Sequence, residues 1–241
     1  MLTRLDHLVV LARDLEEAVK YHKDLGFTVT PGGEHADGLT RNALIPFKDG
    51  SYLELVSFLD PEDTQDNVWE WRKFLASGGL IDYCAASEDL RSEVRRLREC
   101  GFEVDGPHEG GRRLPDGREI RWRTASIRQE GRMLPFLIED LTPRELRVPG
   151  GSSAKHPNGA TGLMRLEIAV PDVDRSLESL IAFTGVPALA GTSFALGSCV
   201  LDLMTPRNED NARRHLNRNG AGPVTAVIGA NGAKVIRLPG R

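Results

Sequence analysis

The sequence predicts an α+β protein in which paired βαβββ modules form a curved mixed sheet, with a third, degenerate module after them. Three observations lead to this prediction. The same order of strand and helix patterns recurs along the 241 residues. Each copy opens on an apolar strand pattern, which is followed by an aspartate suited to cap a helix: Asp14, Asp89 and Asp172. A single module leaves one face of its sheet bare, so we expect two modules to pair around a ligand cleft.

The first module is predicted over residues 1–59. Asp14 and Glu17 form a capping-box pattern at the start of its helix, and Gly26 is placed to end that helix. The turn at Lys48–Asp49–Gly50 joins the last two strand patterns as a hairpin. Strands are expected at 4–10, at 27–31, and over the segments RNALIPF and SYLELVSF.

The second module is predicted over residues 78–147. Its helix runs from Asp89 to Cys100 and is followed by Gly101. The segment between the two modules, which includes NVWEWRKFLA, has helix-forming residues and an apolar face, so we expect a helical linker there. Together the two modules make a predicted domain over 1–147. Its further strands are expected at 80–87, 102–106, 118–127 and 133–140.

The third module is predicted over residues 161–241, after a linker rich in Pro, Gly and Ser. Its strand and helix patterns lie in LMRLEIAVPDVDRSLESLIAF, and Gly197 marks a hairpin turn. A helix is expected within 205–220. Because the edge strands of a lone module need cover, we expect the chain to form a homodimer.

Composition excludes several classes of protein. The formal net charge of −4 and the pI of about 5.9 argue against a nucleic-acid partner, which needs a basic surface. No apolar run is long enough to span a membrane, and the start of the chain lacks the pattern of a signal peptide. We therefore expect a cytoplasmic protein. Its three cysteines match no zinc or redox motif and are expected to be reduced structural thiols.

Two polar side chains interrupt apolar strands of the first module. His7 lies in the first strand pattern and Glu54 in the last, between Leu53 and Leu55. A buried carboxylate needs a compensating partner, which is a metal, a histidine, or an arginine such as Arg41 or Arg123. Imidazole with carboxylate suits Zn, Mn, Fe or Ni better than Ca or Mg, so a divalent metal is one candidate cofactor.

Other polar residues are candidates for binding a small-molecule ligand. Asn42 lies in the middle of a strand, where it has either a ligand or the backbone as partner. Arg121 and Arg123 share one strand face, with Trp122 on the other, and are suited either to hold an anionic substrate or to form a solvated face. The loop histidines, His35 and His108, are expected to face solvent.

The segments LDHLVVLARDLEEA, YHKDLGF and RNALIPFKDGSYLELV resemble the opening module of the glyoxalase/bleomycin-resistance/extradiol-dioxygenase superfamily, also called vicinal oxygen chelate proteins. The string HPNGA at 156–160 resembles that of its longer glyoxalase-like members. In that superfamily the first-strand histidine and last-strand glutamate hold a divalent metal that chelates two adjacent substrate oxygens. The resemblance therefore implies His7 and Glu54 as metal ligands and gives Glu54 the catalytic role.

The resemblance leaves the remaining ligands open. Superfamily sites draw three or four ligands from two modules, and the position of module two that matches His7 is Asp82, a possible third ligand. The matching position of module three is Arg165, which is no metal ligand. Two functions are consistent with this pattern. One is a metal-dependent lyase, isomerase or dioxygenase acting on a small oxygenated molecule. The other is a non-catalytic protein that sequesters a small molecule, as bleomycin-resistance proteins do.

Overall fold

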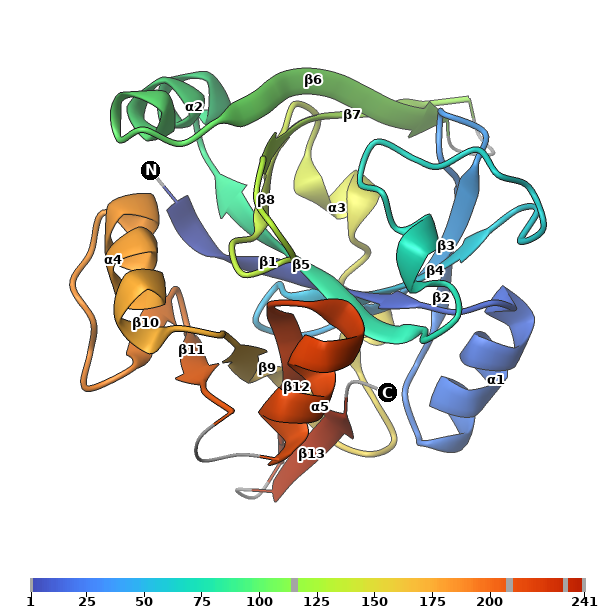
Figure 1. Ribbon diagram of the computed structural model, residues 1–241. Helices are drawn as coiled ribbons and strands as arrows, with labels where there is room; N and C mark the ends of the chain where they lie inside the picture. Colours follow the sequence, from blue (N-terminus) through green and yellow to red (C-terminus); the bar gives the residue numbers. More distant parts are fainter. Residues whose placement is uncertain (1, 114–116, 207–209, 232–233, 240–241) are drawn as a thin grey trace.

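The computed structural model describes residues 2–113, 117–206, 210–231 and 234–239. Its strands form two sheets (Figure 1). The larger sheet has eight strands in the order β2-β3-β4-β1-β5-β8-β7-β6, and the smaller has five in the order β10-β11-β9-β12-β13. The predicted α+β architecture with a curved mixed sheet is confirmed.

The first βαβββ module forms one half of the larger sheet. Asp14 caps its helix, accepting a hydrogen bond from the main-chain nitrogen of Glu17, and Gly26 follows the helix end with a positive φ of 82°. Its elements are β1 (Leu2–Leu11), α1 (Leu15–Asp24), β2 (Thr30–Glu34), β3 (Thr40–Pro46) and β4 (Tyr52–Phe58).

The second module forms the other half of that sheet with the same order of elements. Asp89 caps its helix through the main-chain nitrogen of Ser92. β1 and β5 lie antiparallel at the centre of the sheet, and each runs parallel to the last strand of its own module. The elements are β5 (Gly79–Ser87), α2 (Leu90–Glu99), β6 (Val104–Arg113), β7 (Glu119–Ile127) and β8 (Phe136–Asp140).

The two faces of the larger sheet bury different residues. Leu8 and Leu53 belong to the main core, which also holds residues of α2 and of the smaller sheet. Val9 and Val56, which lie an odd number of residues from Leu8 and Leu53 and so face the opposite side, belong to a second cluster with Trp71 and other aromatic residues. His7 and Glu54 share the alternation of this second face, which is the face that carries the candidate site.

The linker between the modules differs from the prediction. Only a 3₁₀ turn, Arg72–Phe74, forms where a helix was expected. The side chain of Asn67 accepts from the main-chain nitrogens of Trp69 and Trp71, and Asp66 accepts from that of Arg72. These local bonds take the donors that a helix would use, so the expectation of a helical linker is wrong.

The strand expected at 27–31 begins three residues later, at Thr30. Thr28 instead bonds to the distant linker: its main-chain nitrogen donates to Nδ1 of His156, and its hydroxyl donates to the carbonyl of Lys155. The 148–160 linker therefore takes the place of a strand partner at this point.

The third module contributes the smaller sheet. Leu166 and Ala226, from adjacent strands of that sheet, belong to the same core as the larger sheet. Whether residues 161–241 form a separate domain stays a prediction. Of the helix expected within 205–220, the structure describes α5 (Asp210–Asn219), and residues 207–209 lie outside the described residues. The remaining elements are α3 (Arg144–Arg147), a 3₁₀ turn (Gly151–Ala154), β9 (Ala160–Ala169), α4 (Val173–Thr184), β10 (Ser193–Leu196), β11 (Cys199–Met204), α5, β12 (Gly222–Ala230) and β13 (Lys234–Pro239).

None of the helices in the described ranges combines the length and the apolar character that crossing a membrane requires.

Candidate functional site

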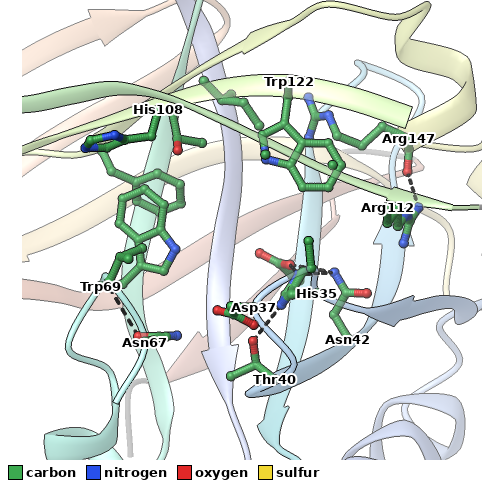
Figure 2. A pocket seen from close by; sticks show the side chains of 18 of the residues that line it. His35, Asp37, Thr40, Asn42, Asn67, Trp69, His108, Arg112, Trp122 and Arg147 are labelled. Carbon is green, nitrogen blue, oxygen red and sulfur yellow. Dashed lines mark hydrogen bonds and ion pairs between the residues drawn. The ribbon is translucent and has the colours of Figure 1, made fainter. Parts of the chain in front are cut away.

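A cavity of about 260 Å³ lies against the second face of the larger sheet. Strands of both modules, the loop between β2 and β3, and the inter-module linker contribute to its wall (Figure 2). The polar residues of this wall include His7, His35, Thr40, Asn42, Glu54, Asn67, His108, Glu109, Arg112 and Arg147.

The structure brings His7 and Glu54 together in this cavity. Nε2 of His7 lies 3.4 Å from Oε2 of Glu54, and both side chains are almost fully buried. The register explains the contact: Glu54 pairs with Val9, two residues along β1 from His7, so the two side chains project from the same sheet face. The predicted juxtaposition is present, and the role of the pair as metal ligands stays a prediction.

Asp6 orients the ring of His7. Its Oδ1 lies 2.8 Å from Nδ1 of His7, which leaves Nε2 facing the cavity. The ring also stacks on Tyr52, with centroids 4.5 Å apart. Burial alone would lower the pKa of His7, but its hydrogen bonds to Asp6 and Glu54 raise that pKa above its ordinary value.

Both oxygens of Glu54 have partners. Asn42 donates to Oε1 at 2.6 Å, and Nε2 of His35 lies 3.3 Å from the same oxygen. Burial would raise the pKa of Glu54, but the two histidines hold it well below its ordinary value, so this carboxyl is ionised. The arginine partners that the sequence left open are not used. Arg41 pairs with Glu16 instead.

The close fit around Asn42 depends on a glycine. A Cβ at Gly32 would lie 1.8 Å from Oδ1 of Asn42, so a side chain at this position would displace the amide. The side chain of Asn42 itself contacts Glu54 and His35, so its observed partners are side chains of the cavity and not the backbone partner that the sequence also allowed. A ligand role for Asn42 stays a prediction.

Asp82 is placed differently from the other predicted ligands. Its Oδ2 accepts from Nε1 of Trp71 at 2.9 Å and lies 3.1 Å from Nε of Arg132. It does not line the His7–Glu54 cavity, but a neighbouring one of about 180 Å³. The structure therefore does not join Asp82 to the predicted pair.

Arg121 and Arg123 also lie outside the cavity. Arg121 is exposed and pairs with Glu109 at 2.7 Å, and Arg123 pairs with Glu109 and Glu139. Trp122, between them on β7, is the residue that lines the cavity. The arginines of the cavity wall come from elsewhere, namely Arg112 of β6 and Arg147 of α3, and sequence reasoning did not single these out.

The second module closes its side of the cavity with aromatic residues. Phe136 pairs with Cys84, two residues after Asp82, just as Glu54 pairs with a residue two positions after His7. Phe136 thus takes the position in module two that Glu54 has in module one. Its ring lies 5.4 Å from that of His7 and 4.5 Å from that of Trp69.

The loop histidines are distributed in a way that the sequence did not predict. His35 lines the cavity and is only 21% exposed, contrary to the expectation that it faces solvent. His108 also borders the cavity, but its side chain is 63% exposed, as expected. His35 is held by Thr40, whose hydroxyl lies 2.6 Å from Nδ1. His156 is buried and donates through Nε2 to the carbonyl of Pro46 at 2.8 Å, so it supports the linker and not the cavity. For His35, the only signal in the sequence is its distance of five residues from Thr40, and this pattern is too common to predict a site.

The donor set partly fits a divalent metal. Imidazole and carboxylate are suitable ligands for Zn, Mn, Fe or Ni, and a carboxylate behind a ligating histidine, as Asp6 is behind His7, is typical of such sites. Within the described ranges, however, no cluster of three or more His, Cys, Asp or Glu side chains is arranged to hold a metal. His7 and Glu54 would therefore hold the metal as a pair, with the other coordination positions of the metal open.

The paired βαβββ modules around a His–Glu cavity define the vicinal oxygen chelate class of proteins. Residues 5–183 match the family described as Glyoxalase-like domain, and the chain belongs to that family. No curated protein matches the chain.

Two solved structures agree with the fold, and a third is similar over part of the chain. A hypothetical protein from Staphylococcus aureus is similar over 97% of both chains, with a TM-score of 0.74 and 12% identity. A mutant of 4-hydroxymandelate synthase from Streptomyces coelicolor covers 92% of this chain and 70% of its own, with a TM-score of 0.61 and 16% identity. A variant of methylmalonyl-CoA epimerase from Streptomyces coelicolor, in complex with 2-nitronate-propionyl-CoA, covers 59% of this chain and 100% of its own, with a TM-score of 0.44 and 22% identity.

Proposed function

We propose that this protein is a metal-dependent enzyme of the lyase, isomerase or dioxygenase type that acts on a small oxygenated molecule. The observation that supports this most directly is the pairing of His7 and Glu54 inside the cavity, with Nε2 of His7 3.4 Å from the carboxylate. Asp6 occupies the other ring nitrogen, so Nε2 is the atom available to a metal.

The residues of the chain have distinct parts in this proposal. His7 and Glu54 would hold the metal, and Asn42 and His35 would fix the orientation of the Glu54 carboxylate. A divalent metal bound there supplies Lewis-acid stabilisation of negative charge on substrate oxygens. The aromatic wall of Trp69, Trp122 and Phe136 would exclude water from the substrate. Asp82 has no part, because Arg132 and Trp71 satisfy its carboxylate.

Because the chain offers a pair of ligands and no complete set, we expect modest affinity for the metal alone. The test is the metal content of protein purified without chelator, followed by titration with Zn²⁺ and Mn²⁺. His7→Ala and Glu54→Gln should each abolish stoichiometric binding. His108→Ala is the matched control, since this histidine lines the same cavity but pairs with Asp105. Unchanged metal binding by His7→Ala would overturn the proposal.

A second candidate function is sequestration of a small molecule without a metal. It is favoured by one observation: His7, His35 and Asn42 already satisfy both oxygens of Glu54 without any ion. Under this alternative the wild-type protein binds neither Zn²⁺ nor Mn²⁺ with defined stoichiometry, and ligand binding is insensitive to EDTA. Ligand binding that EDTA abolishes would exclude it.

We further propose that the protein is cytoplasmic and forms a homodimer. The dimer is supported by β13 and β10, which lie at the edges of the smaller sheet, and by exposed apolar residues such as Val235 on β13. Light scattering coupled to size-exclusion chromatography tests the dimer, and a monomer at micromolar concentration would overturn the dimer proposal.

A further inference from the structure

Arg112 of β6 lines the cavity with unused capacity to bind an anion. Its Nη2 donates to the main-chain oxygen of Arg147 at 3.1 Å, and its Nε is buried without a hydrogen-bond partner (Figure 2). Among the residues that the structure describes, no carboxylate lies within ion-pairing distance of this guanidinium. A half-buried cation of this kind is stabilised by an anion that enters the cavity.

The carboxylate whose charge acts on Arg112, that of Glu54, is already contacted by His7 and His35. Three other acids of this region have arginine partners. Asp6 and Asp140 both pair with Arg147, whose remaining donor is used by the hydroxyl of Tyr52 at 2.7 Å. Glu109 pairs with two arginines of β7. Arg147 is thus saturated although it lines the same cavity, and Arg112 is the arginine with donors to spare.

The walls beside Arg112 are flat and aromatic. Trp122 lies on β7 and Trp69 on the linker, and Figure 2 shows both indoles bordering the same space. Trp69 packs on Phe136 with ring centroids 4.5 Å apart. Within the described part of the chain neither of these two indole N–H groups has a hydrogen-bond acceptor. Trp71, in contrast, donates to Asp82.

We infer that the cavity recognises a monocarboxylate with an aromatic body, whose carboxylate pairs with Arg112 and whose ring lies between Trp69 and Trp122. This inference rests on the proposed function only for the use of this cavity as the binding site. A carboxylate matches the forked geometry of a guanidinium. A phosphate dianion is disfavoured because Asp37, Glu54 and Glu109 also line the cavity and would repel its second charge.

The experiment compares 3-phenylpropionate with its uncharged isostere, 3-phenylpropionamide, and with inorganic phosphate, by calorimetry and tryptophan fluorescence. The wild-type protein should bind the acid at least about tenfold more tightly than the amide. Arg112→Met should remove this preference, and Arg112→Lys should retain part of it. Arg121→Met is the matched control, because that arginine is exposed and does not line the cavity, and it should keep the full preference.

Separate readouts distinguish this inference from the metal proposal. Arg112→Met should keep the metal content and circular dichroism spectrum of the wild type, whereas His7→Ala tests the metal alone. If His7→Ala binds metal as the wild type does, and the wild type still prefers the acid to the amide, only the metal proposal is overturned. The recognition of a carboxylate would be overturned by equal affinity for acid and amide, or by the absence of saturable binding of the acid at millimolar concentration. It would also be overturned if phosphate competed as well as the acid, or if Arg112→Met kept the preference of the wild type.

Discussion

Asp6 and Arg147 lie 141 residues apart in the chain and form a fully buried ion pair, with Nη1 of Arg147 3.2 Å from Oδ1 of Asp6. The same Oδ1 contacts Nδ1 of His7. Burial opposes the ionisation of Asp6, but Arg147 and His7 together hold its pKa well below the ordinary value. The orientation of the candidate metal ligand thus depends on an arginine from the end of the second module.

Removing this charge should cost stability. Asp6→Asn leaves Arg147 with only part of its compensation in a buried position, and we expect a loss of about 3 kcal/mol in the free energy of unfolding. Urea titration measures it. Asp105→Asn, an exposed acid paired with His108, is the control and should change stability by less than about 0.5 kcal/mol. Equal stability of the two variants would contradict the importance of the buried pair.

The width of the cavity should depend on Gly110. A Cβ at this position would lie 2.7 Å from Nε1 of Trp122, its partner across the β6–β7 ladder, so the indole must move. We expect Gly110→Ala to shift the indole N–H resonance of Trp122 in a ¹⁵N–¹H spectrum and to leave that of Trp71 in place. Gly150→Ala, where a Cβ meets nothing within 4 Å, is the control. An unmoved Trp122 resonance would be evidence against the packing described.

Stability should fall on acidification through His215 of α5. Burial, with a smaller effect from Arg218, lowers the pKa of His215 from 6.5 to about 4. Between these values the unfolded chain binds a proton that the folded chain does not. The stabilisation is therefore complete above about pH 6.5 and is lost as the pH falls towards 4.

His215→Gln should flatten this part of the dependence of the melting temperature on pH, measured by calorimetry from pH 7 downwards. The carboxylates titrate in both proteins, so the difference between the two curves isolates the histidine. Parallel curves would show that His215 titrates alike in the folded and unfolded chains.

The cysteines should differ in reactivity. Cys84 and Cys199 are buried, and burial raises the pKa of both thiols, that of Cys199 to about 12. Cys100 is exposed. Because the thiolate is the reactive form, the native protein should react with a thiol reagent at Cys100 first, and at the others only after unfolding. Cys100→Ser should abolish the fast phase, and a fast phase that survives would contradict this assignment.

Much of the fold and half of the site were predictable from local pattern. The aspartate caps marked three helices, and apolar alternation marked the strands of both modules. Alternation also placed His7 and Glu54 in equivalent settings within one module, where parallel pairing brings them to the same sheet face. Local propensity was misleading at 60–77, where Asp66 and Asn67 bind the backbone that a helix would have used.

By itself the sequence determined the modular architecture, because repeated strand and helix patterns mark each module. Period-2 alternation singled out His7 and Glu54 as polar residues in apolar strands, and the family resemblance implied that they act together. Only the tertiary structure decided which face of β7 is the inner one, and so why Trp122 and not Arg121 borders the cavity. It also decided that Arg132 satisfies Asp82 and that Arg112 has no carboxylate partner among the described residues. Such pairings join segments far apart in the chain, and their distances are set by the curvature of the sheet and the packing of its two modules.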